Sequence, residues 1–414
     1  MGFNIYLFLT ISWFLHLGAR LPALGYIHVD LLLVILLSFF PAQGASAFTL
    51  NDKKDNAISK ILFILIVYAL VSLPFVEWPG SVIHRGIPNF IRAFIFYFFT
   101  KKFIHTERQL KIFIIVFLVC QTFRVMEPIY LHITSGYWGS SAYIGDGQVM
   151  NRLGGAPMDI INPNGLAFVI LSILPFCFMF LSSNGWTKIL SPMVIIFSVY
   201  ALQLTGSRSG FLGLVIILLY LLLLSKKKIV MAITLSLAAL CFFATLTPMQ
   251  RDRYLSIVGD STTANNTTAE RRLTGIGNNF SVALRRPLFG HGLGTSREAN
   301  ANFGGGDQPS HNLYAEVAQE LGFVGLAIFL FYIKTVLIKG ITALRYFKKR
   351  TEQESRAYIY RLVNALQVWF IMNLFFSFFS YGLSSYEWYL FPALFDIVGN
   401  AVESNKKKLV EANA

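Results

Sequence analysis

Residues 186–224 read WTKILSPMVIIFSVYALQLTGSRSGFLGLVIILLYLLLL, two apolar runs whose only charged residues are Lys188 and Arg208. Each run approaches the roughly 17–25 apolar residues that cross a bilayer as a helix. Inside a bilayer only helices and closed barrels satisfy their backbone hydrogen bonds. This stretch therefore predicts two membrane-spanning helices joined by a tight turn that contains one arginine.

Similar runs recur along the whole chain. Of its 414 residues, 55% are hydrophobic and only 14% are charged, whereas a soluble chain carries roughly 25% charged residues. This composition excludes a cytosolic enzyme, a disordered chain and a coiled coil. The sequence predicts an all-α polytopic membrane protein with about 12 transmembrane helices. The predicted spans cover residues 3–18, 21–40, 58–76, 82–100, 110–126, 160–181, 186–204, 209–224, 229–246, 321–338, 358–379 and 383–398.

The basic residues predict the orientation. If both termini are cytoplasmic, every lysine lies in an inner segment or at an inner membrane edge, and the bases elsewhere are all arginine. The expected units are residues 1–246 with helices 1–9, a large outer loop at 247–320, residues 321–400 with helices 10–12, and a cytoplasmic tail at 401–414. The three cysteines all lie in apolar runs, so no disulfide framework is expected.

Two outer loops are long. The first, residues 127–159, is rich in Gly, Ser and Tyr and leads to the turn-forming run Asn162-Pro163-Asn164-Gly165. In the second, residues 247–320, apolar residues recur at spacings near four between Leu273 and Leu284, which predicts a helix. Glycine-rich turns follow, and a further helix is expected to begin after Ser310 as its cap.

Three segments are candidates for chemistry. Arg208 lies among small residues that let a phosphate approach, although it could equally be a snorkelling arginine. The pairs Arg271-Arg272 and Arg285-Arg286 lie in the large loop, where arginine pairs more often form a solvated face. At the start of a helix His311 is kept neutral and available as a base, although a lone histidine is usually a surface or capping residue. No spacing of His, Cys, Asp or Glu favours a metal site, and no cofactor is expected.

Four segments, taken in order, resemble the O-antigen ligase and O-antigen polymerase superfamily of bacterial envelope polysaccharide glycosyltransferases. They are GSRSG (206–210), RL (272–273) leading to RPLFGHGLG (286–294), HN (311–312) and ELGFVGL (320–326). Twelve spans with a large outer loop between the ninth and tenth are similar to that family as well. Asn162-Pro163-Asn164 matches a further family feature.

The resemblance implies an inverting, metal-independent transferase in the bacterial inner membrane, with its active site on the periplasmic side. Its donor would be a glycan on undecaprenyl pyrophosphate, and its acceptor a hydroxyl of lipid A-core or of another glycan, as in lipopolysaccharide or other surface polysaccharide assembly. By the family pattern Arg208 and Arg272 would hold the pyrophosphate and His311 would activate the acceptor. The residues expected to bind substrate are Arg271, Arg286, Asn312, Arg152 and Asn164. Whether Arg271 or Arg272 contacts the pyrophosphate, and whether His291 acts, stays open.

Other functions remain in competition. A polymerase would use the same donor as a ligase and differ in its acceptor. A proton-coupled transporter is favoured by His28 and Asp30 within the second predicted span, because ionisable residues inside a membrane are often functional. Arg85 and Arg92 share a face of the fourth predicted span and would likewise favour a transporter. A non-catalytic assembly subunit is the third hypothesis. No nucleic-acid partner is expected.

Overall fold

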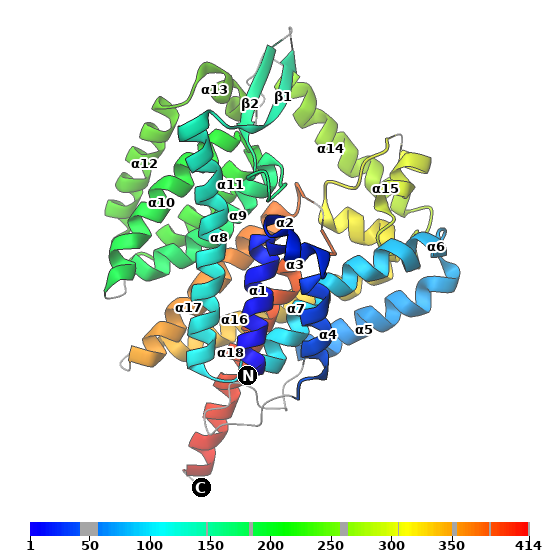
Figure 1. Cartoon of the computed structure of the whole chain (residues 1–414), viewed down its shortest axis with the longest axis vertical. Helices are drawn as coiled ribbons and strands as arrows, with labels where there is room; N and C mark the ends of the chain where they lie inside the picture. Colours follow the sequence, from blue (N-terminus) through cyan, green and yellow to red (C-terminus); the bar gives the residue numbers. More distant parts are fainter. Residues whose placement is uncertain are drawn as a thin grey trace.

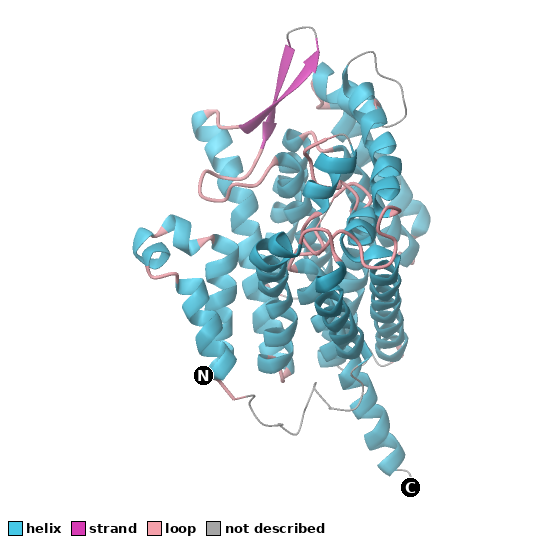
Figure 2. Cartoon of the chain, turned by 90° about the vertical axis from the view of Figure 1, so that its right-hand side faces the viewer, coloured by secondary structure: helices cyan, strands magenta, loops and turns pink. Residues whose placement is uncertain are grey.

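The computed structural model describes residues 1–41, 57–145, 148–181, 185–256, 264–304, 306–349, 354–380 and 382–412. Within these residues the chain is a helical bundle with one two-stranded hairpin (Figure 2). Both termini lie at the same end of the bundle, and the hairpin lies at the opposite end (Figure 1). The predicted all-α polytopic class is confirmed.

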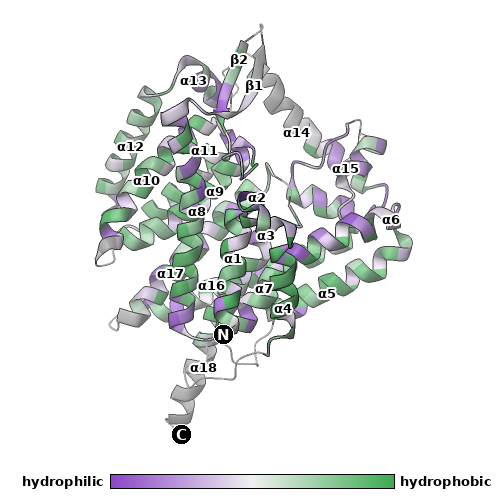
Figure 3. Ribbon diagram, in the orientation of Figure 1, coloured by the Kyte–Doolittle hydropathy of each residue, from purple (hydrophilic) through white to green (hydrophobic). Residues whose placement is uncertain are grey.

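Long apolar helices dominate the bundle, and in Figure 3 most of their residues are coloured as hydrophobic. Six segments of the described chain are long and apolar enough to cross a membrane: Ala57–Phe75, Glu107–Ser135, Pro163–Leu181, Thr187–Thr205, Leu313–Lys348 and Ala357–Phe376. They belong to α5 (Ala57–Ser72, followed by a 3-10 turn Leu73–Phe75), α8 (Glu107–Ser135), α9 (Pro163–Leu181), α10 (Trp186–Thr205), α16 (Leu313–Lys348) and α17 (Glu354–Phe376). Shorter apolar helices are α1 (Gly2–Leu15), α4 (Val29–Phe39), α11 (Arg208–Leu224) and α12 (Lys228–Ala244).

The remaining elements are short, amphipathic or polar. They are α2 (Leu17–Arg20), α3 (Pro22–Tyr26), α6 (Pro79–Ser81), a π-helix (Val82–Gly86), α7 (Ile87–Phe103), α13 (Pro248–Leu255), α14 (Ala264–Ala283), α15 (Ser296–Ala299), a second π-helix (Asn300–Gly304) and α18 (Glu387–Ala412). Every predicted span falls on at least one helix, and the number of membrane crossings stays a prediction. The helix predicted in the large loop is confirmed as α14.

The span predicted at residues 21–40 is not one helix. It is divided into α3 and α4 at His28, whose φ of 50° is in the left-handed region. Asp30 therefore lies in the first turn of α4 rather than in the middle of a helix, and its Oδ1 accepts a hydrogen bond from Ser12 at 2.5 Å. Apolar residues on both sides of the break hid it from the hydropathy pattern.

The first outer loop is also more ordered than its composition predicts. Helix α8 continues to Ser135, well beyond the predicted end at residue 126, with Pro128 inside it. Strands β1 (Gly139–Gly145) and β2 (Gln148–Leu153) then form an antiparallel hairpin in which Gly139 lies opposite Leu153. Glycine is depleted in strands, which is why the sequence predicted only a loop here.

Glycines allow close helix packing beside the α10–α11 turn. A Cβ added to Gly210 would lie 2.7 Å from Cβ of Ala167, and one added to Gly213 would lie 2.5 Å from Cδ1 of Leu171. The backbone of α11 therefore packs directly against side chains of α9, a close approach that small residues permit in membranes. This contact fixes the beginning of α11 against α9.

Helix α16 is broken at Gly322, where φ is 69° and ψ is −179°. The glycine-rich segment 287–294 packs against the break and satisfies the backbone groups that the break frees. The N–H groups of His291 and Gly292 donate to the carbonyls of Gln319 and Glu320 at 2.7 and 3.0 Å, and Phe323 N–H donates to Pro287 at 2.7 Å. The family-like segments at 286–294 and 320–326 thus form one structural joint.

Gly322→Ala is expected to destabilise the protein strongly. Its conformation belongs to a region that only glycine adopts readily, at a cost of about 1–3 kcal/mol for other residues. The new Cβ would also lie 2.1 Å from the Leu288 carbonyl oxygen. Thermal unfolding in detergent measures the effect, with Gly277→Ala in α14 as the control because nothing lies within 4 Å of its Cβ position. Equal melting temperatures for both variants would show that the joint tolerates a side chain.

A buried ion pair fixes the loop that leads into α9. Nε and Nη2 of Arg124 on α8 donate to the two carboxylate oxygens of Asp159 at 2.5 and 3.0 Å, and Nε2 of His16 lies 3.1 Å from Oδ1. Burial raises the pKa of Asp159, but the hydrogen bonds from His16 and Arg124 outweigh it and lower this pKa to about 2. Asp159 is therefore ionised and joins α1, α8 and the β2–α9 loop.

Asp159→Asn should cost about 3–5 kcal/mol, because it leaves the buried Arg124 guanidinium without its counter-charge. Denaturant unfolding in detergent checks this value. Asp307→Asn is the matched control, since its pair with Arg297 is solvent-exposed on both sides and contributes little. The two substitutions having the same effect would contradict the structural role assigned to Asp159.

Candidate active site

The turn between α10 and α11 presents Arg208 at the first position of a helix. Gly206 ends α10 in the left-handed region with φ 55°, which glycine adopts without strain. Ser207 is the N-cap of α11, and its hydroxyl accepts a hydrogen bond from the N–H of Gly210 at 3.2 Å. The GSRSG segment therefore makes the predicted tight turn and fixes the backbone of Arg208.

Three buried arginines converge on this turn from different elements. Arg152 of β2 donates from Nε to the Thr205 carbonyl at 2.8 Å. Arg253 of α13 donates from Nε to the Gly206 carbonyl at 2.7 Å. The side chains of Arg152, Arg208 and Arg253 are each only 8% exposed. Their guanidinium charges are added to the positive end of the α11 dipole, so the turn is an electropositive position suited to an anion.

Neutral side chains hold the cluster in place. Oδ1 of Asn164 accepts from Nη2 of Arg152 at 3.0 Å and from the Ser207 hydroxyl at 2.9 Å. Nη1 of Arg208 donates to the hydroxyl of Ser256 at 2.9 Å. The structure thus brings together three of the residues chosen from the sequence, namely Arg152, Asn164 and Arg208.

Arg253 was not among the predicted site residues. It is oriented by the start of α13, where Thr247 and Gln250 form a capping box after which the helix turns Arg253 toward Gly206. Arg251, two residues earlier, is exposed instead. The capping pattern T-P-x-Q could have predicted a helix here, but not which arginine faces the turn.

His311 and Asn312 lie where α14, α16 and the segment after α17 meet. Asn312, not Ser310, is the N-cap of α16: its Oδ1 accepts from Ala315 N–H at 3.0 Å, and its Nδ2 donates to the Phe378 carbonyl at 3.2 Å. Ser310 is buried and accepts a hydrogen bond from Asn279 of α14. Both residues suit a cap, so composition did not separate them. His311 precedes this anchored cap, and its side chain is exposed.

The two histidines of the loop differ sharply. His291 is 1% exposed, its ring lies 5.6 Å from that of Trp78 and 5.4 Å from that of Phe303, and its Nε2 lies 3.0 Å from the Val282 carbonyl. Burial lowers its pKa and keeps it neutral. A ring enclosed in this way suits packing, whereas the exposed His311 suits contact with a substrate.

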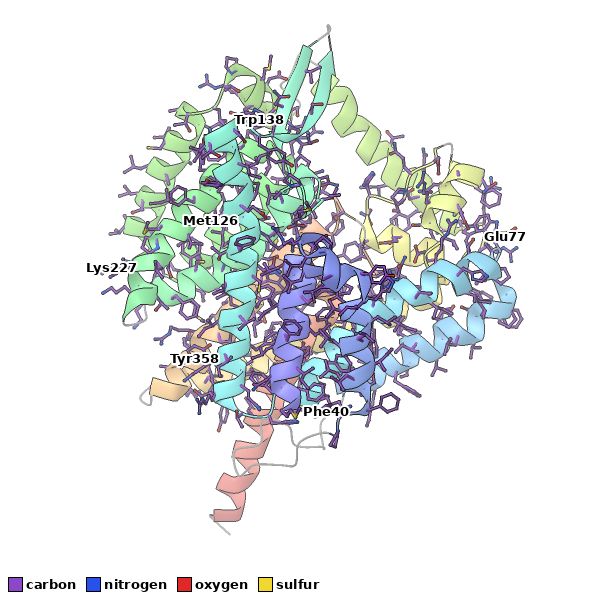
Figure 4. All side chains as sticks on the ribbon, viewed as in Figure 1. Phe40, Glu77, Met126, Trp138, Lys227 and Tyr358 are labelled. Atoms are coloured by element: carbon purple, nitrogen blue, oxygen red, sulfur yellow. The ribbon has the colours of Figure 1, made fainter. Side chains whose placement is uncertain are left out.

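The other predicted arginines lie elsewhere. Arg286 forms an ion pair with Glu77 and donates to the Phe75 carbonyl at 3.1 Å. Glu77 lies at the edge of the molecule away from α10 and α12 (Figure 4), so Arg286 links the loop to the end of α5. The backbone of α14 carries Arg271 and Arg272, whose side chains lie outside the described part of the chain. Substrate binding by these three residues and by Asn312 stays a prediction.

A comparison with known protein families covers the region around the turn. Residues 193–330 match the family model described as O-antigen ligase. The match includes the α10–α11 turn, α11–α15 and the joint at Gly322. No curated protein matches the chain significantly. The match supports glycosyltransferase activity of the ligase or polymerase type in a multi-pass membrane protein, and it confirms over residues 193–330 that this chain resembles the O-antigen ligase and polymerase superfamily.

Proposed function

We propose that the protein is a ligase that transfers a glycan from undecaprenyl pyrophosphate to an acceptor hydroxyl on the periplasmic face of the bacterial inner membrane. The proposal is supported mainly by the convergence of Arg152, Arg208 and Arg253 on one turn within the matched region. Planar guanidinium groups suit the oxygens of a diphosphate because they donate two parallel hydrogen bonds.

The proposed reaction breaks the bond between the anomeric carbon and the diphosphate oxygen. The electron pair of that bond leaves with the diphosphate, where Arg208 and its neighbours stabilise the developing negative charge. The acceptor oxygen attacks the anomeric carbon from the opposite side, which inverts its configuration. The acceptor proton goes to the neutral imidazole of His311. Guanidinium groups stabilise the negative charge on the diphosphate leaving group, so the proposed reaction requires no metal ion.

Deleting the gene tests this proposal. A ligase predicts that long glycan accumulates on the polyprenyl carrier, whereas a polymerase predicts single repeats on the final acceptor. Unchanged surface glycan would contradict both. Complementation with Asp30→Asn separates a transferase from a transporter: a transferase should retain activity, because Asp30 accepts a hydrogen bond from Ser12 at a helix start. Loss of function in Asp30→Asn but not in His311→Ala would favour transport.

A further inference from the structure

A buried polar stripe runs along the first two turns of α16. The stripe consists of Asn312, Glu316, Gln319 and Glu320. Residues three and four apart lie on one face of a helix, and all four side chains are buried. A buried polar group costs free energy unless it is hydrogen-bonded. The partners of these side chains therefore show what the start of α16 holds in place.

Glu316 fills a concave backbone site between α17 and α18. Its Oε2 accepts hydrogen bonds from the N–H groups of Gly382 and Leu383, at 2.6 and 3.2 Å. Gly382 has a φ of 140°, a conformation that glycine adopts without strain. Successive N–H groups that converge in this way form a nest for an oxygen. The chain therefore supplies both the nest and the oxygen that occupies it.

The segment that contains this nest lies beside the start of α16. The N–H of Leu313 donates a hydrogen bond to the Ser377 carbonyl at 2.9 Å. Nδ2 of Asn312 donates to the Phe378 carbonyl. The segment after α17 is thus held at one end by the two residues that follow the proposed base, and at the other end by Glu316.

The neighbouring Glu320 holds a different segment. Its Oε2 accepts a hydrogen bond from the Gly294 N–H at 2.8 Å, and its Oε1 accepts one from the Ser296 N–H at 3.3 Å. These contacts add to the joint at the break in α16. Of the two buried carboxylates, Glu316 is therefore the one that supports the surroundings of His311.

We infer that Glu316 is a positioning residue for the proposed base: it holds the segment after α17 against the start of α16 and so fixes where the His311 imidazole lies. The inference rests on the proposed function for the role of His311. It assigns a role to a buried carboxylate that the transfer reaction itself does not use. A displacement of about 1 Å at a reacting group can lower the rate about 10²-fold.

Two substitutions separate the position of the Glu316 oxygen from its charge. Both hydrogen bonds come from neutral N–H groups, so they require an oxygen at the right place rather than a negative charge. In Glu316→Gln the side chain keeps its length, and its amide oxygen can accept two hydrogen bonds. In Glu316→Asp the charge stays, but the side chain is one methylene shorter and its oxygen is withdrawn from the nest.

Transfer kinetics with purified donor and acceptor in nanodiscs test the inference. In Glu316→Asp kcat should fall about 10²-fold while KM for the lipid-linked donor stays near the wild-type value. Glu316→Gln should keep a kcat close to that of the wild type. The matched control is Glu127→Asp, which shortens a carboxylate that pairs with Arg20 instead and should not change kcat. A large loss of kcat in Glu316→Gln would overturn the inference, whether or not Glu316→Asp folds.

Hydrogen exchange measured by mass spectrometry gives a readout that does not depend on transfer. Peptides that contain the amides of Gly382 and Leu383 should exchange faster in Glu316→Asp, because amides released from a hydrogen bond lose protection. They should exchange as in the wild type in Glu316→Gln and Glu127→Asp. Unchanged exchange in Glu316→Asp, or faster exchange with unchanged kcat, would overturn the inference. Absence of transfer by the wild-type protein, with faster exchange in Glu316→Asp, would reject the proposed function and with it the catalytic meaning of this contact.

Discussion

Arg208→Ala is expected to abolish glycan transfer while the protein still folds and inserts. Removing one preorganised donor to a developing oxyanion typically lowers kcat by about 10²–10³-fold. Arg208 is one of the three buried arginines at the turn, and the cap on Ser207 holds its backbone in place. We therefore expect at least this loss in an assay that uses purified lipid-linked donor and acceptor.

Two further variants separate geometry from charge. Arg208→Lys keeps the positive charge but not the planar fork, so it should be severely impaired as well. Arg251→Ala, on helix α13, is the control, because Arg251 is exposed and the described contact of its side chain is a single 3.4 Å hydrogen bond to the Phe243 carbonyl. Near-normal transfer by Arg208→Lys would reduce Arg208 to a charge or packing role.

His311→Ala is expected to lower kcat by about 10²–10⁴-fold, the usual contribution of a positioned general base. Stability should change little, because the side chain is exposed and the start of α16 is capped by Asn312. Initial rates at saturating donor and acceptor measure the effect on kcat. If His311 is the base, KM for the lipid-linked donor should stay close to the wild-type value.

His84→Ala is the control for His311, since His84 is also exposed and lies in the π-helix before α7. It should transfer glycan at the wild-type rate. A His311→Ala protein that attaches glycan normally would remove the proposed base from the mechanism and return attention to the other histidines.

The apolar pattern predicted the helices well because burial in lipid requires long apolar runs whatever the tertiary contacts. It did not predict the break at His28, since apolar residues continue on both sides of it, nor the break at Gly322. The break at Gly322 is stable only because residues 287–294 supply hydrogen bonds from a distant part of the chain.

Only part of the candidate site could be predicted from the sequence. The small residues around Arg208 indicated the turn directly, because Gly206 and Ser207 determine it locally. Arg152 and Arg253 reach that turn from β2 and α13, and no local pattern shows which side chains meet there. The segment 286–294 looked like part of the site by resemblance, yet its described contacts form a joint that supports α16.

The most direct test is a cryo-EM structure of the protein in nanodiscs with undecaprenyl pyrophosphate. We predict diphosphate density beside the α10–α11 turn, with its oxygens about 2.7–3.2 Å from the guanidinium nitrogens of Arg208. Diphosphate bound at a position that Arg208 does not contact, or a turn that faces the cytoplasm, would contradict the account.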